Sequence, residues 1–176
     1  MHLDGARIFL ASAYKGIKPR EYASHFDTVY VSLYKYFNAA SGAILAGPKS
    51  VIEDMYHTRR MFGGGMHQSW PFAAVANHYF DGFEERYAKA KSTSENLIKN
   101  LSKEDRFTIK RVENGSNIFT LEVKGITAKD FAKNLKDQGI IANPRTANSL
   151  NLLVNESLNF ITEDELLYKF KKSLIQ

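Results

Sequence analysis

A lysine that closes an apolar stretch is the residue of this sequence best suited to covalent chemistry. Lys35 follows Thr28–Val31, a run of β-branched and aromatic residues that predicts a buried strand. Low-dielectric surroundings at the end of such a strand favour a neutral amine, which is the form that attacks a carbonyl carbon. A lysine at a strand end can also extend its ammonium group into solvent. Lys35 taken alone leaves both interpretations open.

Four motifs, one of which ends in Lys35, occur in a fixed order and spacing. They are His2–Arg7, Val29–Lys35, Ser41–Gly47 and Arg59–Met66. Together they resemble the motifs of the pyridoxal-phosphate-dependent threonine aldolases and of the related β-eliminating lyases. The resemblance is dense over residues 1–90 and thin in the rest of the chain. An ordered set of this kind is a specific signal, whereas any one of the motifs alone is weak.

The resemblance implies that the cofactor is pyridoxal 5'-phosphate. This cofactor takes up electrons at the α-carbon of an amino acid, and it is held as an imine on a lysine with a carboxylate beside its ring nitrogen. Lys35 corresponds to that lysine. Asp4 corresponds to the carboxylate that keeps the ring nitrogen protonated. Both residues are therefore expected to bind the cofactor and to act in catalysis.

The same resemblance assigns roles to cationic side chains. Arg7 is expected in the cofactor site, where a guanidinium group can hold the substrate carboxylate with two hydrogen bonds. Arg60 corresponds to a cation near the cofactor phosphate, often that of a neighbouring subunit, which implies a homo-oligomer (a dimer or a tetramer). His67 stands where the family usually has a phosphate-binding arginine. Asn151 stands where aldolases carry a second arginine for the substrate, and Arg145 is close enough in sequence to replace it.

The activity implied by the resemblance is that of an amino-acid lyase of the threonine aldolase type. Such an enzyme cleaves a β-hydroxy-α-amino acid, such as L-threonine or L-allo-threonine, to glycine and an aldehyde. One alternative is β-elimination, in which Lys35 removes the α-proton and a β-substituent leaves. A second alternative, from a different class, is a truncated and inactive relative that acts as an interaction protein. The sequence does not decide among them.

Only Met1–Leu3 precede the Asp4 motif, which in the family follows a strand in the middle of the polypeptide. The chain is therefore expected to be the C-terminal half of a longer enzyme. On its own it is expected to be inactive. A central sheet that is cut at this point would expose an apolar face and an unpaired edge, so self-association through residues 1–85 is also expected.

Composition limits the other function classes. The net charge is +5, from 24 basic and 19 acidic residues, and lysines are mixed with acidic residues along helix-like segments, so no nucleic-acid partner is predicted. The sequence has no cysteine, no long apolar run and no signal peptide, which predicts a cytoplasmic protein without a membrane partner. No two histidines have metal-binding spacing, so no metal is predicted.

The elements that must position these residues follow from periodicity and punctuation. The fold class predicted through the resemblance is α/β, as the C-terminal half of an aspartate-aminotransferase-like (fold type I) enzyme. Residues 1–85 form part of the cofactor-binding large domain and residues 86–176 form a small domain. The local predictions are a helix over Val51–Phe62, one long helix from Trp70 through Leu101, a hairpin of Phe107–Val112 and Ile118–Val123 turning at Asn114-Gly115, helices capped by Thr127 and Thr162, and strands at Ile140–Ala142 and Leu150–Val154.

Overall fold

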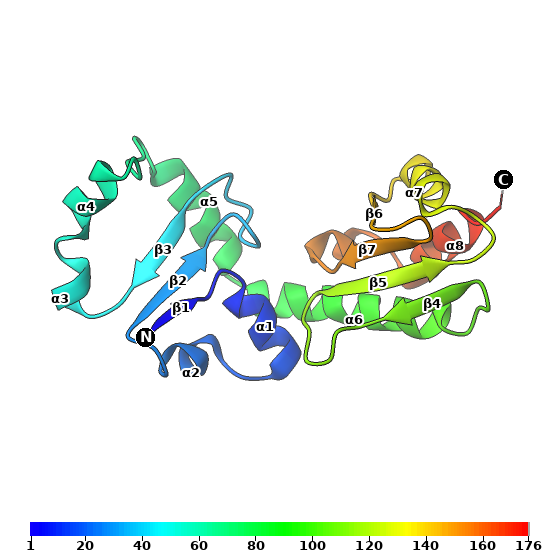
Figure 1. Cartoon of the computed structure of the whole chain (residues 1–176), viewed down its shortest axis with the longest axis horizontal. Coiled ribbons are helices and arrows are strands. Elements are labelled where there is room, and N and C mark those ends of the chain that lie inside the picture. The colour runs from blue at the N-terminus through cyan, green and yellow to red at the C-terminus, as the bar shows by residue number, and fades with distance from the viewer. Residues whose placement is uncertain (176) are drawn as a thin grey trace. The chain divides into compact units, whose positions relative to one another are not determined.

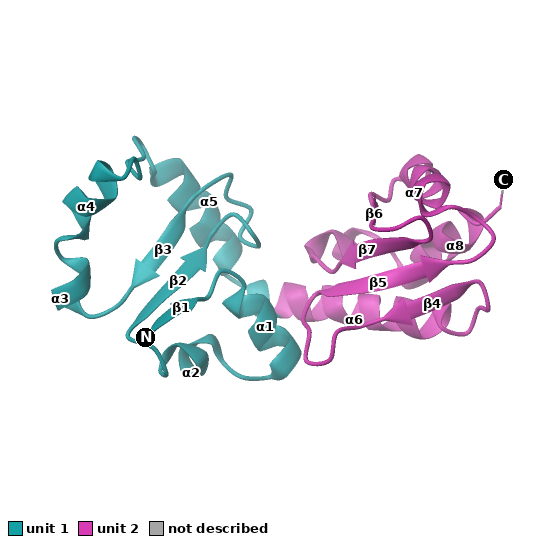
Figure 2. Ribbon diagram, viewed as in Figure 1, with its two compact units in different colours: residues 1–84 teal, residues 85–176 magenta. Residues whose placement is uncertain are grey.

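The computed structural model describes residues 1–175, and the chain divides into two compact units. Unit 1 is Met1–Glu84 and unit 2 is Glu85–Gln176 (Figure 2). Each unit has its own sheet, of three strands in unit 1 and of four strands in unit 2. The division into domains 1–85 and 86–176, as independently folding bodies, stays a prediction.

Unit 1 is a small mixed sheet with short helices (Figure 1). Its elements are β1 His2–Asp4, α1 Ile8–Lys15, α2 Pro19–Ala23, β2 Thr28–Ser32, β3 Ala43–Ala46, α3 Lys49–Ile52, α4 Met55–Met61 and α5 Trp70–Phe80. In the order β1-β2-β3, β1 is parallel to β2 and β3 is antiparallel to it. Both β1 and β3 are therefore edge strands, and all four residues of β3 are exposed.

The central strand of unit 1, β2, has two unlike faces because strand residues point alternately to opposite sides. Thr28, Tyr30 and Ser32 form a polar face, and Val29 and Val31 form an apolar one. Val29 and Ser32 are buried, one on each face, and the other three residues are half-buried, so the prediction of a buried strand is correct in part. The alternation of hydroxyl and aliphatic side chains is the pattern of a half-buried strand.

The core of unit 1 is a cluster of aromatic rings around Phe9 of α1. The ring of Phe9 lies 5.7 Å from that of Tyr36, 5.2 Å from Phe37, 5.8 Å from Phe80 and 6.2 Å from Phe83, measured between centroids. Most of these pairs meet edge to face, which is a favoured geometry for aromatic side chains. The cluster joins the loop after β2 to the segment where α5 ends.

Unit 2 is a two-layer α/β structure. Its elements are most of α6 Phe83–Leu101, then β4 Phe107–Lys110, β5 Ile118–Val123, α7 Ala128–Asp137, β6 Asn143–Pro144, β7 Ser149–Leu153, a 3-10 helix Glu156–Phe160, and α8 Glu163–Lys172. The sheet order is β4-β5-β7-β6 and every pairing is antiparallel. Phe119, Leu121 and Val123 alternate along β5 and are buried, so one face of the sheet forms the core with the helices.

Local signals in unit 2 are confirmed. Asn114 adopts a left-handed conformation (φ 57°) between β4 and β5, as the Asn-Gly turn predicts. The Thr127 side chain accepts a hydrogen bond from the Asp130 backbone N–H at 3.1 Å, and Thr162 does the same for Glu165 at 3.3 Å. The order β-β-α-β-β-α that follows from the predicted elements is found, although its third strand lies at Asn143–Pro144 and not at the residues predicted.

Two helix predictions are wrong because the chain breaks inside them. The helix expected from Trp70 through Leu101 is interrupted after Phe80, where Gly82 takes a left-handed conformation (φ 69°) that few residues other than glycine adopt. The helix expected over Val51–Phe62 is divided into α3 and α4 by a turn at residues 53–54. Among the described residues, no helix combines the length and the apolar character needed to cross a bilayer.

The strand predicted at Ile140–Ala142 is also wrong. The Ile140 N–H donates to the carbonyl of Leu135 at 2.8 Å, next to Gly139 with its positive φ of 81°. This is the hydrogen bond that finishes a helix with a left-handed glycine, so Ile140 completes α7. Ile141 is 82% exposed, and the strand β6 is limited to Asn143–Pro144.

Candidate active site

The parallel pairing of β1 and β2 places two of the predicted residues at one edge of the unit 1 sheet. Carboxyl ends of parallel strands lie at the same edge. Asp4 is the last residue of β1 and pairs with Tyr30 of β2. Lys35 lies in the turn formed by residues 34–36, shortly after β2 ends at Ser32. The carboxylate and the amine therefore belong to the same edge.

The prediction that Lys35 closes the strand itself is wrong. After β2 the Leu33 N–H still donates to the Gly42 carbonyl at 3.0 Å, and the Phe37 N–H then donates back to Leu33 at 3.1 Å. Lys35 therefore lies in a turn beyond the end of the strand, and it is half-buried. Its Nζ atom lies 5.5 Å from the centroid of the Tyr34 ring, a cation–π contact.

Asp4 is held by a tight turn at the end of β1. Its Oδ1 accepts the Ala6 N–H at 3.1 Å, which is the side-chain-to-backbone bond of an Asx turn. Gly5 lets this turn lie against β2, since a Cβ atom there would be 2.8 Å from the Tyr30 carbonyl oxygen. Among residues 1–175, the second carboxylate oxygen of Asp4 has no hydrogen-bond or ion-pair partner. One oxygen is thus fixed and the other is available to a ligand.

Arg7 joins this edge from the start of α1, where it occupies the N-cap position. It is exposed and has no carboxylate partner in the described part of the chain. Its guanidinium charge acts on Tyr34, as does the charge of Lys35. The edge therefore combines one carboxylate, Asp4, with two cations that form no ion pair within residues 1–175.

Arg60 and His67 are not brought to this edge by any contact of the described residues. Arg60 lies on α4, donates to the Tyr56 hydroxyl at 2.9 Å and is exposed. His67 lies exposed in the loop between α4 and α5. A cavity of about 810 Å³ in unit 1 opens between the apolar face of β2 and α5, but its lining contains neither of these residues nor Asp4 or Lys35.

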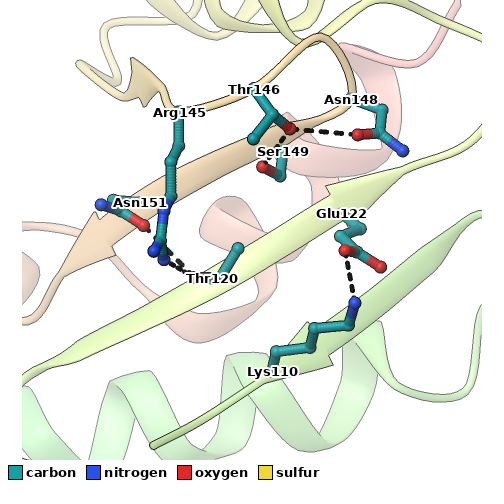
Figure 3. Close-up of polar contacts among 8 residues, drawn as sticks. All are labelled: Lys110, Thr120, Glu122, Arg145, Thr146, Asn148, Ser149 and Asn151. Carbon is teal, nitrogen blue, oxygen red and sulfur yellow. Dashed lines mark hydrogen bonds and ion pairs between the residues drawn. The ribbon is translucent and has the colours of Figure 1, made fainter.

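Arg145, the remaining predicted residue, lies on unit 2 (Figure 3). Its guanidinium Nη1 donates to the Thr120 hydroxyl at 3.2 Å, and that hydroxyl donates to the Asn151 side-chain oxygen at 3.2 Å. Thr120 and Asn151 face each other across β5 and β7. Among the described residues Arg145 has no acidic partner, whereas the neighbouring Lys110 is paired with Glu122 at 2.6 Å.

Sequence reasoning missed three hydroxyl side chains beside Lys35. Ser32 donates to the Tyr30 hydroxyl at 3.3 Å. Hydrogen bonding from these two hydroxyls, followed by the charge of Lys35, lowers the pKa of the Tyr34 phenol. The alternation of Thr28, Tyr30 and Ser32 is the signal that could have revealed a polar face. On the other side of Lys35 the environment is opposite, because burial raises the pKa of the Tyr36 phenol.

The residues at this edge fit pyridoxal phosphate. The cofactor needs an amine for its covalent link and a carboxylate for its ring nitrogen. Lys35, in the turn after β2, provides the amine, and the free oxygen of Asp4, at the end of the neighbouring β1, provides the carboxylate. Arg7 adds a guanidinium without an ion pair among residues 1–175. No group of acidic, histidine or cysteine residues in the described chain has the arrangement of a metal site.

Comparison with known proteins identifies what this arrangement is similar to. The family model described as beta-eliminating lyase matches residues 1–124, which include all four motifs. The low-specificity L-threonine aldolase of Candida albicans is 40% identical over 81 residues, covering 46% of this chain and 22% of that protein. The resemblance inferred from the motifs is confirmed.

Solved structures show the same fold. A candidate aromatic amino acid beta-eliminating lyase/threonine aldolase from Exiguobacterium sp. 255-15 superimposes with a TM-score of 0.79 at 22% identity, covering 98% of this chain and 51% of the other. The ornithine aminotransferase of Toxoplasma gondii gives 0.62 at 14% identity, covering 99% and 42%. The fold is thus part of the aspartate-aminotransferase-like, fold type I architecture, and the chain spans about half the length of these proteins or less.

Proposed function

Since this chain belongs to the beta-eliminating lyase family, whose members depend on pyridoxal phosphate, we propose that its gene product is a lyase of the threonine aldolase type. The substrate is a β-hydroxy-α-amino acid such as L-threonine or L-allo-threonine, and the products are glycine and an aldehyde. The observation that carries the proposal is the parallel pairing of β1 with β2, which sets Asp4 and Lys35 at one edge. The 40% identity to a low-specificity L-threonine aldolase supports the choice of reaction.

Asp4 and Lys35 hold the cofactor in this proposal. When bound, pyridoxal phosphate supplies an electron-withdrawing ring that weakens the bonds at the substrate's α-carbon. Lys35, in the turn at residues 34–36, binds it through its amine. Asp4 presents its free oxygen to the ring nitrogen, while its other oxygen stays fixed by the Ala6 N–H. A fixed carboxylate keeps the ring nitrogen protonated without reorganising during the reaction.

Two arginines and one histidine complete the proposed binding groups in unit 1. Arg7 holds the substrate carboxylate, because its planar guanidinium can donate two parallel hydrogen bonds. Arg60 and His67 bind the cofactor phosphate, and Arg60 does so for a neighbouring subunit, as the family resemblance implies. We therefore infer a homo-oligomer, and we infer a cytoplasmic location from the cysteine-free composition.

On unit 2 we assign the substrate carboxylate a second anchor, Arg145. One of its nitrogens donates to Thr120, which leaves the other N–H groups of the guanidinium for an anion. The contact through Thr120 to Asn151 holds the side chain above the polar face of the sheet. In this sense Arg145 replaces the arginine that aldolases have at the position of Asn151.

The test is covalent trapping on the complete gene product. Pyridoxal phosphate is added, the link is reduced with borohydride, and peptides are mapped by mass spectrometry. We expect the label on Lys35, its loss in Lys35→Ala and its retention in Lys49→Ala, which removes an exposed lysine of the same unit. A label on another lysine would contradict the assignment.

The same protein then distinguishes the candidate reactions. L-allo-threonine is expected to yield acetaldehyde and glycine without ammonia. The family model is named for β-elimination, so this reaction is the second candidate. Ammonia and a keto acid from a β-substituted amino acid would favour it. Absence of both activities would favour an inactive relative that acts as an interaction protein.

A further inference from the structure

The residue that precedes Lys35 belongs to a cluster of hydroxyl groups to which the proposed function assigns no task. Ser32 is fully buried, with 0% exposure, and donates to the Tyr30 hydroxyl at 3.3 Å. Tyr34 is 47% exposed, and hydrogen bonding from the hydroxyls of Ser32 and Tyr30 lowers the pKa of its phenol. Each of these two hydroxyl groups can turn its hydrogen atom toward the Tyr34 oxygen, because a hydroxyl hydrogen rotates to suit its partners. Two hydroxyl groups of β2 can therefore stabilise an ionised Tyr34.

The charges around Tyr34 have one sign. Lys35 lies 5.5 Å from the ring centroid, and Arg7 acts on the phenol from the start of α1. The hydrogen bond with Ser32, then that with Tyr30, and then the charges of Lys35 and Arg7 lower the pKa of Tyr34. Each of these groups stabilises the phenolate, because each places a hydrogen atom or a positive charge near its oxygen.

Cleavage of a β-hydroxy-α-amino acid needs a group that accepts the hydroxyl proton. Arginine side chains do not give up their proton in proteins, so an arginine such as Arg7 does not serve as a base. Asp4 is engaged with the ring nitrogen, and Lys35, which the substrate's amine displaces from the cofactor, must bind the cofactor again when the product leaves. Within the described part of this edge Tyr34 is exposed, whereas Tyr30 is half-buried and Tyr36 is buried, so Tyr34 is the phenol that a substrate hydroxyl can reach.

We propose that Tyr34 is the general base of this site and that its oxygen accepts the proton of the substrate's β-hydroxyl group. The inference rests on the proposed function. In this step the O–H bond breaks, its proton passes to Tyr34 Oη, and its electron pair becomes the second bond of the aldehyde carbonyl. The Cα–Cβ bond breaks and its electron pair remains with the α-carbon. That carbon takes up a proton from solvent, and Tyr34 later releases one.

The decisive variant is Tyr34→Phe in the complete gene product loaded with pyridoxal phosphate. It keeps the ring over Lys35 and removes only the hydroxyl. Two reactions are measured: cleavage of L-allo-threonine, and exchange of the α-proton of glycine in D2O, which involves no substrate hydroxyl. Cleavage is expected to fall by about 10²-fold or more, the usual contribution of a general base. Glycine exchange is expected to be unchanged. Tyr168→Phe, an exposed tyrosine on α8, is the matched control and should alter neither reaction.

A second readout needs no cofactor and no turnover. With tyrosine labelled at the ring carbon that bears the hydroxyl, NMR follows the ionisation of Tyr34, identified by the signal that Tyr34→Phe removes. Its midpoint is expected below the ordinary value of about 10. Ser32→Ala and Arg7→Gln should each raise this midpoint, since each removes a group that stabilises the phenolate.

The pH dependence of turnover is measured separately, on the enzyme loaded with pyridoxal phosphate. The rate of cleavage by the wild-type enzyme should rise with pH up to the midpoint of Tyr34, and Tyr34→Phe should lose that rise.

The outcomes separate this inference from the proposed function. Wild-type protein that does not cleave L-allo-threonine overturns the proposed function and the role of Tyr34 together. Wild-type cleavage that persists in Tyr34→Phe overturns only the role of Tyr34. Equal loss of cleavage and glycine exchange would also overturn it, because Tyr34 would then act by supporting the bound cofactor. A Tyr34 signal that titrates at the ordinary value has the same consequence.

Discussion

The two units differ in how they use their apolar residues. In unit 2 the helix α7 buries five of its residues, and β5 buries every second one. In unit 1 neither α3, α4 nor β3 contains a buried residue. Several large apolar side chains of unit 1 are more than half exposed: Ile44, Tyr56, Met61, Phe62, Trp70 and Phe80. Unit 2 also exposes single apolar side chains, such as Ile141 and Phe160, but its α7 and β5 each bury one face. In unit 1 three whole elements lack a buried residue, which is a feature of interaction surfaces.

The helix ends show the same contrast. In unit 2 the side chains of Thr127 and Thr162 cap α7 and α8. In unit 1 the helices from α1 to α5 have no such side-chain bond at their N-caps. Helices without caps depend more on contacts made by the rest of the fold. Local signals therefore determine unit 2, and unit 1 depends on what packs against it.

The largest expected effect comes from the core of unit 2. Leu121→Ala removes a fully buried side chain of β5 and should lower the free energy of unfolding by about 3 kcal/mol. Ile44→Ala on β3, where the side chain is 52% exposed, should lower it by about 0.5 kcal/mol. Urea unfolding is followed by circular dichroism for the whole chain and by the fluorescence of the sole tryptophan, Trp70, for unit 1.

The two signals check the comparison directly. Leu121→Ala should shift the transition seen by circular dichroism to lower urea concentration. The transition seen by Trp70 fluorescence should stay at the same urea concentration. Equal destabilisation by the two alanine variants would show that unit 1 buries β3 as well as unit 2 buries β5, and the contrast would be lost.

An intermediate effect is expected on self-association of the 176-residue chain. Ile44→Lys places a charge on the exposed edge strand β3, and charges on edge strands oppose pairing with another chain. We expect about a tenfold weaker association constant, or about 1.4 kcal/mol, by sedimentation equilibrium. Leu153→Lys, at a 48% exposed position of unit 2, is the control and should leave association as it is. If Leu153→Lys weakened association and Ile44→Lys did not, the chain would associate through unit 2.

The smallest expected effect concerns the helix caps. Thr162→Ala removes the bond to the Glu165 N–H at the start of α8 and should cost about 1 kcal/mol in the stability of unit 2. Ser69 is at the equivalent N-cap position of α5 but makes no capping hydrogen bond, so Ser69→Ala should not measurably change the free energy of unfolding. If Ser69→Ala lowered the stability as much as Thr162→Ala does, the helix caps would not distinguish the two units.

These differences explain what the sequence could predict. The hairpin at Asn114 and the caps at Thr127 and Thr162 follow from residues within a few positions of one another, so local reasoning found them. The break at Gly82 did not follow in this way, because a single glycine within a helical pattern is compatible with a continuous helix. Its effect depends on the packing of Phe80 and Phe83 around Phe9.

The candidate site was predictable where chemistry limits the residue types. Asp4, Arg7 and Lys35 stand in motifs whose order is specific, and the pairing of β1 with β2 brings Asp4 and Lys35 to one edge. The hydroxyl cluster of Tyr30 and Tyr34 escaped notice because its members are ordinary strand and turn residues until their geometry is known. No contact of the described residues tests the roles of Arg60 and His67.

The alternation along β2 restricts how this segment can change in evolution. One strand supplies the hydroxyls of the site from Tyr30 and Ser32 and the aliphatic wall of the core from Val29 and Val31. Substitutions on the two faces are independent, so the chemistry can be retuned without repacking the core. An insertion or deletion of one residue within Thr28–Ser32 would exchange the faces, because side chains repeat every two residues. This segment is therefore expected to accept new side chains and to keep its length.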